Sequence, residues 1–178
     1  MTVGRVQNHF ARQSRPAQSG PPRYSLAEGA DIGLHLVIAR QTAGSEELLE
    51  AVLRVAESDP EASFAILLPE TPLQHLHMVS AGTAQALALE AAEEVRRRFV
   101  LAGVRVATVK VTDPNPVVAA EQELAASPYY AGIIVATFPP GLSRWLKLDV
   151  VSRLRRISSL PVMHVVAAAG KTWARGKD

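Results

Sequence analysis

Residues 132–166 read GIIVATFPPGLSRWLKLDVVSRLRRISSLPVMHVV, and this stretch decides the fold class. It opens with a short apolar run, 132–136, of a length typical of a buried strand. A loop containing two prolines and a glycine follows, then an amphipathic segment at 149–157 and a second run rich in β-branched residues at 162–166. A strand, a helix and a strand in this order predict two parallel strands, because parallel neighbours need a crossover connection between them.

The same alternation extends toward the N-terminus. Runs of strand length occur at 34–39, 63–68 and 104–111. Helical patterns lie between them, from Ser45 to the stop at Asp59-Pro60, at 82–102 and at 117–126. Strict alternation predicts an α/β fold with a doubly wound (Rossmann-like) five-stranded parallel sheet.

Local signals at the helix ends support this assignment. Ser45 precedes two glutamates, which favour the first turn of a helix. Gly103 suits the cap of the longest helix, and Asn115-Pro116 suits the start of the next. Asp149 is expected to cap the last helix with its side chain.

Composition narrows the function classes. The 178 residues are 48% hydrophobic and only 5% aromatic, so the core must be largely aliphatic. The absence of cysteine excludes disulfides, thiolate catalysis and cysteine-ligated zinc. A net charge of +2 is too small to argue for nucleic acid. No apolar run approaches the roughly 20 residues of a membrane helix, and no secretory signal is evident, so a cytoplasmic protein without membrane association is expected.

Three segments of different character are predicted. Residues 1–30 contain four arginines and no acid before Glu28, and their Pro, Ser and Gly content predicts a disordered basic tail. Residues 31–168 form the α/β domain. Residues 169–178 are a small, polar C-terminal tail.

The topology predicts where a ligand would bind. In doubly wound sheets, ligands lie beyond the carboxyl ends of the strands near the point where the strand order reverses, which here points to segments 40–45 and 137–149. The Arg40 guanidinium suits carboxylate or phosphate. The predicted ligand-binding residues are Arg40, Gln41, Thr42, Asp113, Thr137, Gly141, Ser143 and Arg144. The alternative is that Arg40 is simply solvated and that the second loop is structural, with Pro139, Pro140, Trp145 and Leu146 covering the end of the sheet.

Other candidate chemistry is weaker. His75 and His77 are two residues apart, but no third metal ligand is evident, so no metal site is predicted. His35 and His164 fall in predicted strands, where neutral histidines of the core are expected. Arg153, Arg155 and Arg156 are interpreted as a solvated helix face rather than a nucleic-acid surface. No nucleophile elbow, Walker sequence or Gly-x-Gly-x-x-Gly occurs, so a non-catalytic protein is favoured.

Over about 35 residues the sequence resembles the end of the universal stress proteins. A divergent branch of that family carries the loop Thr-His-Pro-Pro-Gly-x-Ser-x-Trp-Leu, and this chain matches it except that Phe138 replaces the histidine. The matching residues are Thr137, Pro139, Pro140, Gly141, Ser143, Trp145 and Leu146. The resemblance implies a five-stranded parallel sheet with strand order 3-2-1-4-5 and a homodimer formed through Val162–Val166.

The family's ATP-binding members carry Gly, two residues, Gly, nine residues, then Gly and Ser or Thr. Here Ala136 and Pro139 stand at the first two glycines, Leu148 at the third, and Asp149 at the hydroxyl residue. The resemblance therefore implies a non-catalytic protein of stress response that senses a small ligand or binds a protein partner, with no cofactor assigned. The alternatives are a protein that binds ATP or another adenine nucleotide through a rearranged loop, and a dimeric interaction protein without a small ligand.

Overall fold

The computed structural model describes residues 33–70, 81–127, 129–139 and 149–168. The chain divides into two compact units, Met1–Ala30 and Asp31–Asp178, and every described residue belongs to the second. The predictions for 1–30 and 169–178 lie outside the described residues.

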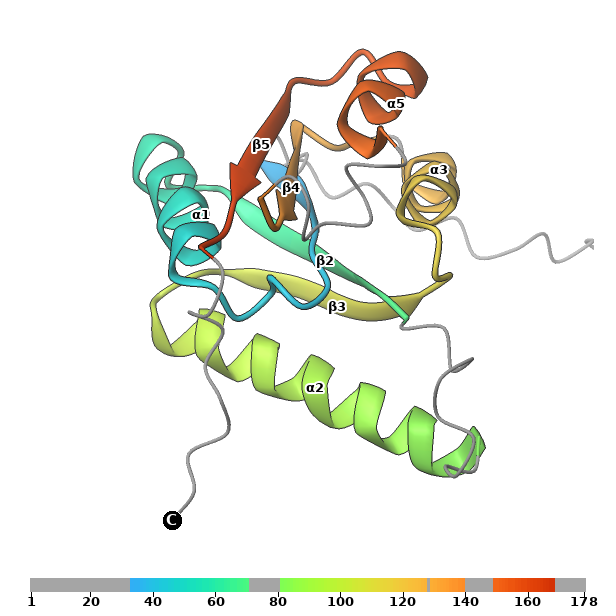
Figure 1. The fold of residues 1–178 in the computed structure, drawn as a ribbon. Coiled ribbons are helices and arrows are strands. Elements are labelled where there is room, and N and C mark those ends of the chain that lie inside the picture. The colour runs from blue at the N-terminus through green and yellow to red at the C-terminus, as the bar shows by residue number, and fades with distance from the viewer. Residues whose placement is uncertain (1–32, 71–80, 128, 140–148, 169–178) are drawn as a thin grey trace, which may run out of the picture. The chain divides into compact units, whose positions relative to one another are not determined.

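The second unit alternates strands and helices along its length (Figure 1). In chain order the elements are β1 (Leu34–Ile38), α1 (Glu46–Ser58), β2 (Ser63–Pro69), α2 (Ala81–Leu101), β3 (Val106–Thr112), α3 (Pro116–Ala126), β4 (Gly132–Thr137), α5 (Val150–Ile157) and β5 (Val162–Val166). All paired strands are parallel, and their order is β3-β2-β1-β4-β5. The predicted fold class and strand order are confirmed.

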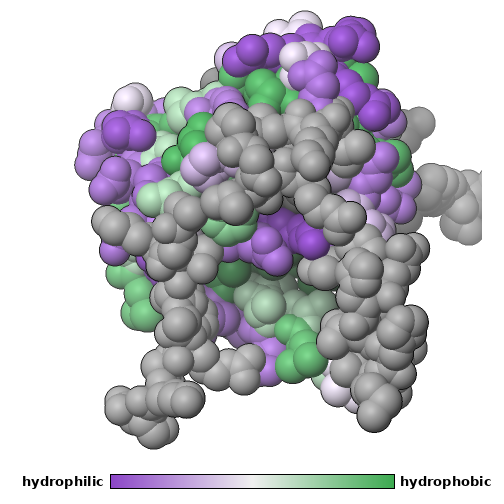
Figure 2. Space-filling model, viewed as in Figure 1, coloured by the Kyte–Doolittle hydropathy of each residue, from purple (hydrophilic) through white to green (hydrophobic). Residues whose placement is uncertain are grey.

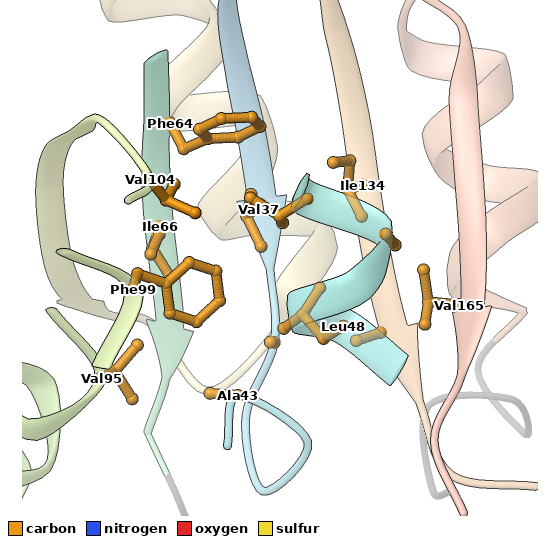
Figure 3. Close-up of a cluster of buried hydrophobic side chains, with 14 of the residues drawn as sticks. Val37, Ala43, Leu48, Phe64, Ile66, Val95, Phe99, Val104, Ile134 and Val165 are labelled. Carbon is orange, nitrogen blue, oxygen red and sulfur yellow. The ribbon is translucent and has the colours of Figure 1, made fainter. Parts of the chain in front are cut away.

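The sheet is covered on both faces, which explains its aliphatic strands. All seven residues of β2 are buried. One core cluster joins the sheet to α1 and α2, and Figure 3 shows its side chains converging from these elements, with Val37, Leu48 and Phe99 among them. The other cluster joins the opposite face to α3 and α5, where Leu36 and Leu154 are buried. Successive residues of β1 thus enter different cores, as the two-residue period of a strand requires.

β3 begins at Val106, two residues later than predicted. The amide of Val104 donates to the carbonyl of Phe99 at the end of α2 (2.9 Å), so Val104 completes the helix end instead of a strand ladder. Gly103 lies between them with a φ of 86°, which confirms it as the helix cap. The β2–β3 register also shifts, from Phe64 opposite Val106 to Ala65 opposite Thr108, and this irregularity marks the start of the strand.

Two helix starts agree with the sequence and one does not. The Ser45 hydroxyl accepts from the Leu48 amide (3.2 Å), and the Asn115 side chain accepts from the Val117 amide (3.0 Å). The prediction that Asp149 caps α5 with its side chain is wrong. Asp149 lies in the left-handed region, with a φ of 48°, and makes no side-chain cap hydrogen bond. An N-cap side chain reaches the first-turn amides from the extended region instead.

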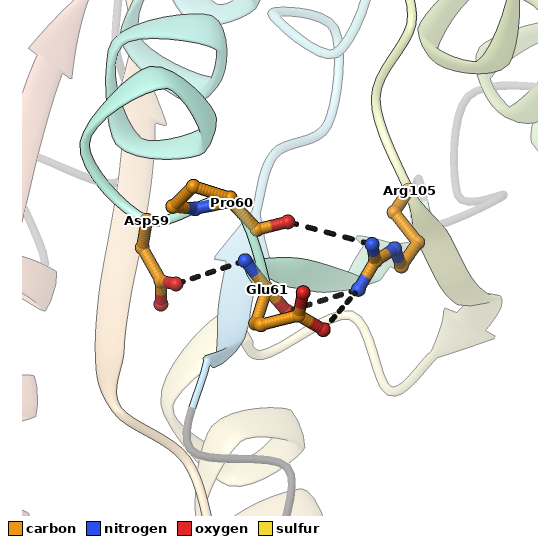
Figure 4. A network of polar contacts seen from close by, with 4 residues as sticks. All are labelled: Asp59, Pro60, Glu61 and Arg105. Carbon is orange, nitrogen blue, oxygen red and sulfur yellow. Dashed lines mark hydrogen bonds and ion pairs between the residues drawn. The ribbon is translucent and has the colours of Figure 1, made fainter.

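At the amino-terminal edge of the sheet, a polar network fixes the turn between α1 and β2 (Figure 4). The Glu61 amide donates to Asp59 Oδ1 (3.0 Å), and Arg105 donates to Glu61 Oε2 (3.2 Å) and to the Pro60 carbonyl (3.4 Å). Because it lies at the edge opposite the carboxyl ends of the strands, this network is a structural tie between α1, β2 and β3.

Candidate ligand-binding site

A pocket of about 190 Å³ opens at the carboxyl ends of β1 and β2, against α2. Its wall is mostly hydrocarbon and is completed by polar side chains from the segments that follow β1 and β2. The lining residues are Arg40, Gln41, Ala43, Leu68, Pro69, Glu70, Ala88, Ala91, Val95 and Val111. Figure 2 shows hydrophobic surface, in green, below a hydrophilic strip near the centre of this face.

The helical wall of the pocket follows from residue spacing. Ala88, Ala91 and Val95 are three and four residues apart, so they share one face of α2. Because Ala88 and Ala91 have small side chains, they leave space that larger side chains would fill. One turn further on, Arg98 donates a hydrogen bond to the carbonyl of Gly44 and ties the loop after β1 to α2. The sheet-side wall is fixed by the Glu70 amide, which donates to the Thr112 carbonyl (3.1 Å) and prolongs the β2–β3 ladder.

Two predicted site residues line this pocket. Arg40 is half-buried and Gln41 is exposed, so both side chains can contact a polar group of a ligand in the pocket. Thr42, the next residue, is buried, and its hydroxyl donates to the Ala136 carbonyl (2.9 Å). Thr42 thus joins the loop after β1 to the carboxyl end of β4.

The other predicted residues lie elsewhere or outside the described residues. Thr137 is buried at the end of β4, and its hydroxyl is hydrogen-bonded to His164 Nε2 (2.8 Å). Asp113 is exposed, and its carboxylate accepts from the Asn115 amide (2.8 Å), which shapes the turn before α3. Gly141, Ser143 and Arg144, together with Trp145, lie outside the described residues. Arg40 and Gln41 therefore line the pocket, whereas Thr42, Asp113 and Thr137 do not.

Sequence reasoning missed the β2 and α2 side of the pocket. Glu70 follows β2 directly at the carboxyl edge, and the alanine spacing in α2 was visible in the sequence. The rule that ligands bind where the strand order reverses predicted a site between the ends of β1 and β4 instead. The β1–β2 side became a pocket because α2 presents small residues to it.

Both described histidines are half-buried members of strands. Burial lowers the pKa of His35, and the nearby Asp59 carboxylate opposes part of this effect. The His35 ring stacks on Phe64 with 5.6 Å between centroids. Burial also lowers the pKa of His164, and the charge of Arg155 lowers it further. Both shifts favour the neutral imidazoles that the sequence predicted, although neither ring is fully buried.

Within the described ranges, no three His, Asp or Glu side chains form a group that could hold a metal ion. His75 and His77 lie outside these ranges. None of the helices in the described part of the chain is long and apolar enough to cross a membrane.

No protein-family model matches the chain, and no curated protein matches it. Solved structures do match. A universal stress protein in complex with cAMP is 20% identical with a TM-score of 0.47, and the match covers 75% of this chain and 96% of that one. A universal stress protein family member from Burkholderia pseudomallei is 16% identical (TM-score 0.47; 76% and 97% covered). A universal stress protein from Archaeoglobus fulgidus is 12% identical (TM-score 0.46; 75% and 93% covered). These solved structures are what the chain is similar to, and the cAMP belongs to the first of them.

Proposed function

We propose that this chain is a cytoplasmic, universal-stress-like protein of stress response, without catalytic chemistry, which binds a small ligand and acts as a sensor or regulator. The observation that carries the proposal is the pocket between α2 and the carboxyl ends of β1 and β2. Its apolar wall favours a compact hydrocarbon or aromatic body. Arg40, Gln41 and Glu70 favour a polar group on that body, directed toward solvent.

The size of the pocket limits the ligand. Pockets that enclose drug-sized molecules usually measure roughly 300–1,000 Å³, and this one measures about 190 Å³. It therefore suits one ring system or a short branched chain. An adenine nucleotide, the alternative ligand, would place only its base in this pocket. Its phosphates would lie outside the pocket and would need to be bound by other groups.

The test blocks the pocket by a single substitution. Ala88 lines the pocket, whereas Ala86 lies on the same helix, is exposed and does not line it. We expect Ala88→Phe to abolish calorimetric binding of a pocket-sized probe and Ala86→Phe to leave it unchanged. The probes are indole, as an apolar ring, and ATP, ADP and AMP with and without Mg²⁺.

The outcomes separate the candidates. Indole binding that is lost in Ala88→Phe supports the proposal. Nucleotide binding that is lost in Ala88→Phe and weakened in Arg40→Ala would favour the nucleotide alternative. Binding that persists unchanged in Ala88→Phe, or no binding of any probe at millimolar concentration, would contradict a ligand site in this pocket.

A homodimer through β5 is a second candidate, and exposed apolar side chains favour it. β5 is an edge strand, paired with β4 on one side. Met163 and Val166 on this strand are 43% and 45% exposed. An exposed apolar edge strand is a site where another chain can add to the sheet, and a second copy supplies an identical edge.

A further inference from the structure

The polar face of α5 carries three exposed arginines, Arg153, Arg155 and Arg156, and the helix contains no acidic residue. None of their guanidinium groups has a hydrogen bond or ion pair with another described residue. Arg97, Arg105 and Lys110, in contrast, are each paired with a glutamate. The α5 face is therefore a concentrated positive charge without a partner among the described side chains.

α5 lies beside the free edge of the sheet. It packs against β5 and against α3, and α3 in turn reaches toward β2 on the same face. The charge of Arg155 is close enough to His164 of β5 to contribute to its lowered pKa. On this face of the sheet, α5 is the described helix nearest to β5's open side (Figure 1).

The geometry of the ladder shows how two copies would meet. The Pro161 carbonyl accepts from the Ile133 amide and the Ala167 amide donates to the Thr137 carbonyl, so odd-numbered residues of this segment face β4. Even-numbered residues, such as His164, therefore direct their backbone groups outward. In a two-fold pair of parallel β5 strands, each outward amide would face the same amide of the other copy. Antiparallel pairing matches amides with carbonyls, so a closed dimer through this edge is antiparallel.

An antiparallel edge-to-edge dimer keeps each face of the sheet on its own side. The two α5 helices then become neighbours on one face. Neighbouring helices pack roughly 8–10 Å apart, which is about one Debye length at physiological salt. Six arginines would gather there, and their repulsion would oppose the dimer unless an anion lies between them.

We propose that the β5 dimer builds an anion site from its two α5 helices, that this site takes a small multivalent phosphate anion, and that the bound anion strengthens the dimer. The inference rests on the dimer proposed above, since one helix supplies only half of the site. Phosphate is the favoured class because a guanidinium fork binds its oxygens in a bidentate manner. A multivalent anion is required because one charge cannot offset arginines from two helices.

The experiment measures the dimer dissociation constant of the full chain by sedimentation equilibrium. Inorganic tripolyphosphate is compared with sodium chloride at the same ionic strength. Matched ionic strength is necessary because α1 exposes Glu46, Glu50 and Glu57, whose repulsion salt also screens. We expect tripolyphosphate to lower the dissociation constant by about tenfold, the scale of one charge-assisted hydrogen bond.

The test variant is Arg155→Gln/Arg156→Gln, and the control is Arg96→Gln/Arg97→Gln on α2, which changes the charge equally. The α5 variant is expected to dimerise more tightly in chloride and to lose the response to tripolyphosphate, whereas the control keeps that response. Circular dichroism melting checks that both variants fold.

Each other result overturns the inference. If the wild-type dimer has the same dissociation constant in both salts, the anion site is refuted, whereas the proposed dimer is not. Tripolyphosphate that binds the monomer without tightening the dimer shows that the site is not shared. A chain that stays monomeric in every salt, in wild type and in both variants, refutes the dimer itself.

Discussion

At the scale of single residues, several polar side chains that the sequence offered to a ligand are hydrogen-bonded within the fold. Thr42 bonds to the β4 carbonyl of Ala136, and Thr137 bonds to His164 on β5. A buried hydroxyl without a partner is costly, and both Thr42 and Thr137 have a partner inside the protein. Arg40 and Gln41, from the loop after β1, line the pocket.

His35 gives stability a pH dependence with a definite sign. Its pKa is lowered from 6.5 in the folded chain, chiefly by burial. Below pH 6.5 the unfolded chain therefore binds more protons than the folded chain, and the free energy of unfolding rises with pH. His35 contributes its full stabilisation above pH 6.5, and this contribution is lost as the pH falls through 6.5 toward the lower folded pKa.

The prediction is checked by thermal melting between about pH 5 and pH 7, the range in which histidine titrates. His35→Phe keeps a ring against Phe64 and removes the titration. We expect the melting temperature of the variant to fall less on acidification than that of wild type. The other histidines titrate in both proteins and cancel in the comparison. Parallel pH profiles would show that His35 binds protons equally in the folded and unfolded chains.

At the scale of elements, α1 and α5 begin in different ways. α1 starts at Ser45, which is buried, extended and hydrogen-bonded to the first turn. α5 starts at Asp149, which is left-handed and contributes no side-chain cap. For a residue other than glycine the left-handed region costs roughly 1–2 kcal/mol, and somewhat less for Asp. The first helix start is thus stabilised by its residue, and the second is held by the packing of Val150 and Leu154.

Substitution at the two caps is expected to have unequal effects. Ser45→Ala should lower the free energy of unfolding by about 1 kcal/mol, because it removes a cap hydrogen bond. Asp149→Gly should leave it unchanged or raise it slightly, because glycine adopts the left-handed conformation without a steric penalty. Urea unfolding of both variants at pH 7 measures the difference. A loss for Asp149→Gly as large as that for Ser45→Ala would mean that the Asp149 carboxylate stabilises α5.

At the scale of the whole molecule, five strands are covered by helices on both faces, and the two edges differ in what they expose. β3 ends the sheet on one side, and β5 ends it on the other. β5 carries exposed Met163 and Val166 between a helix of acidic surface, α1, and one of basic surface, α5. This edge is where association of two chains has the clearest structural basis.

The backbone of β5 provides a sharp test of that association. Val166 directs its amide outward, so Val166→Pro removes a donor from the free edge while leaving the β4 ladder in place. We expect this variant to be monomeric in sedimentation equilibrium. Val166→Ile, which keeps both the amide and an apolar β-branched side chain, is expected to dimerise like wild type in the same buffer. A dimer that survives Val166→Pro would place the contact elsewhere on the molecule.

The sequence by itself determined the element order and the two-sided core. These follow from short-range patterns such as the runs at 34–39 and 132–136, whose hydrophobicity leaves a strand covered on both faces as the consistent solution. Capping by Ser45 and Gly103 could also be predicted, because a cap depends on neighbouring residues only.

Only the tertiary structure decided which polar groups are left for a ligand. The pocket exists because Ala88 and Ala91 of α2 lie against the ends of β1 and β2, which are distant from them in the chain. The same long-range packing joins Thr42 to β4 and holds Asp149 in a conformation that its own sequence disfavours. Local patterns encode which faces are apolar, whereas the spaces left between those faces depend on side-chain volumes that meet only after the chain has folded.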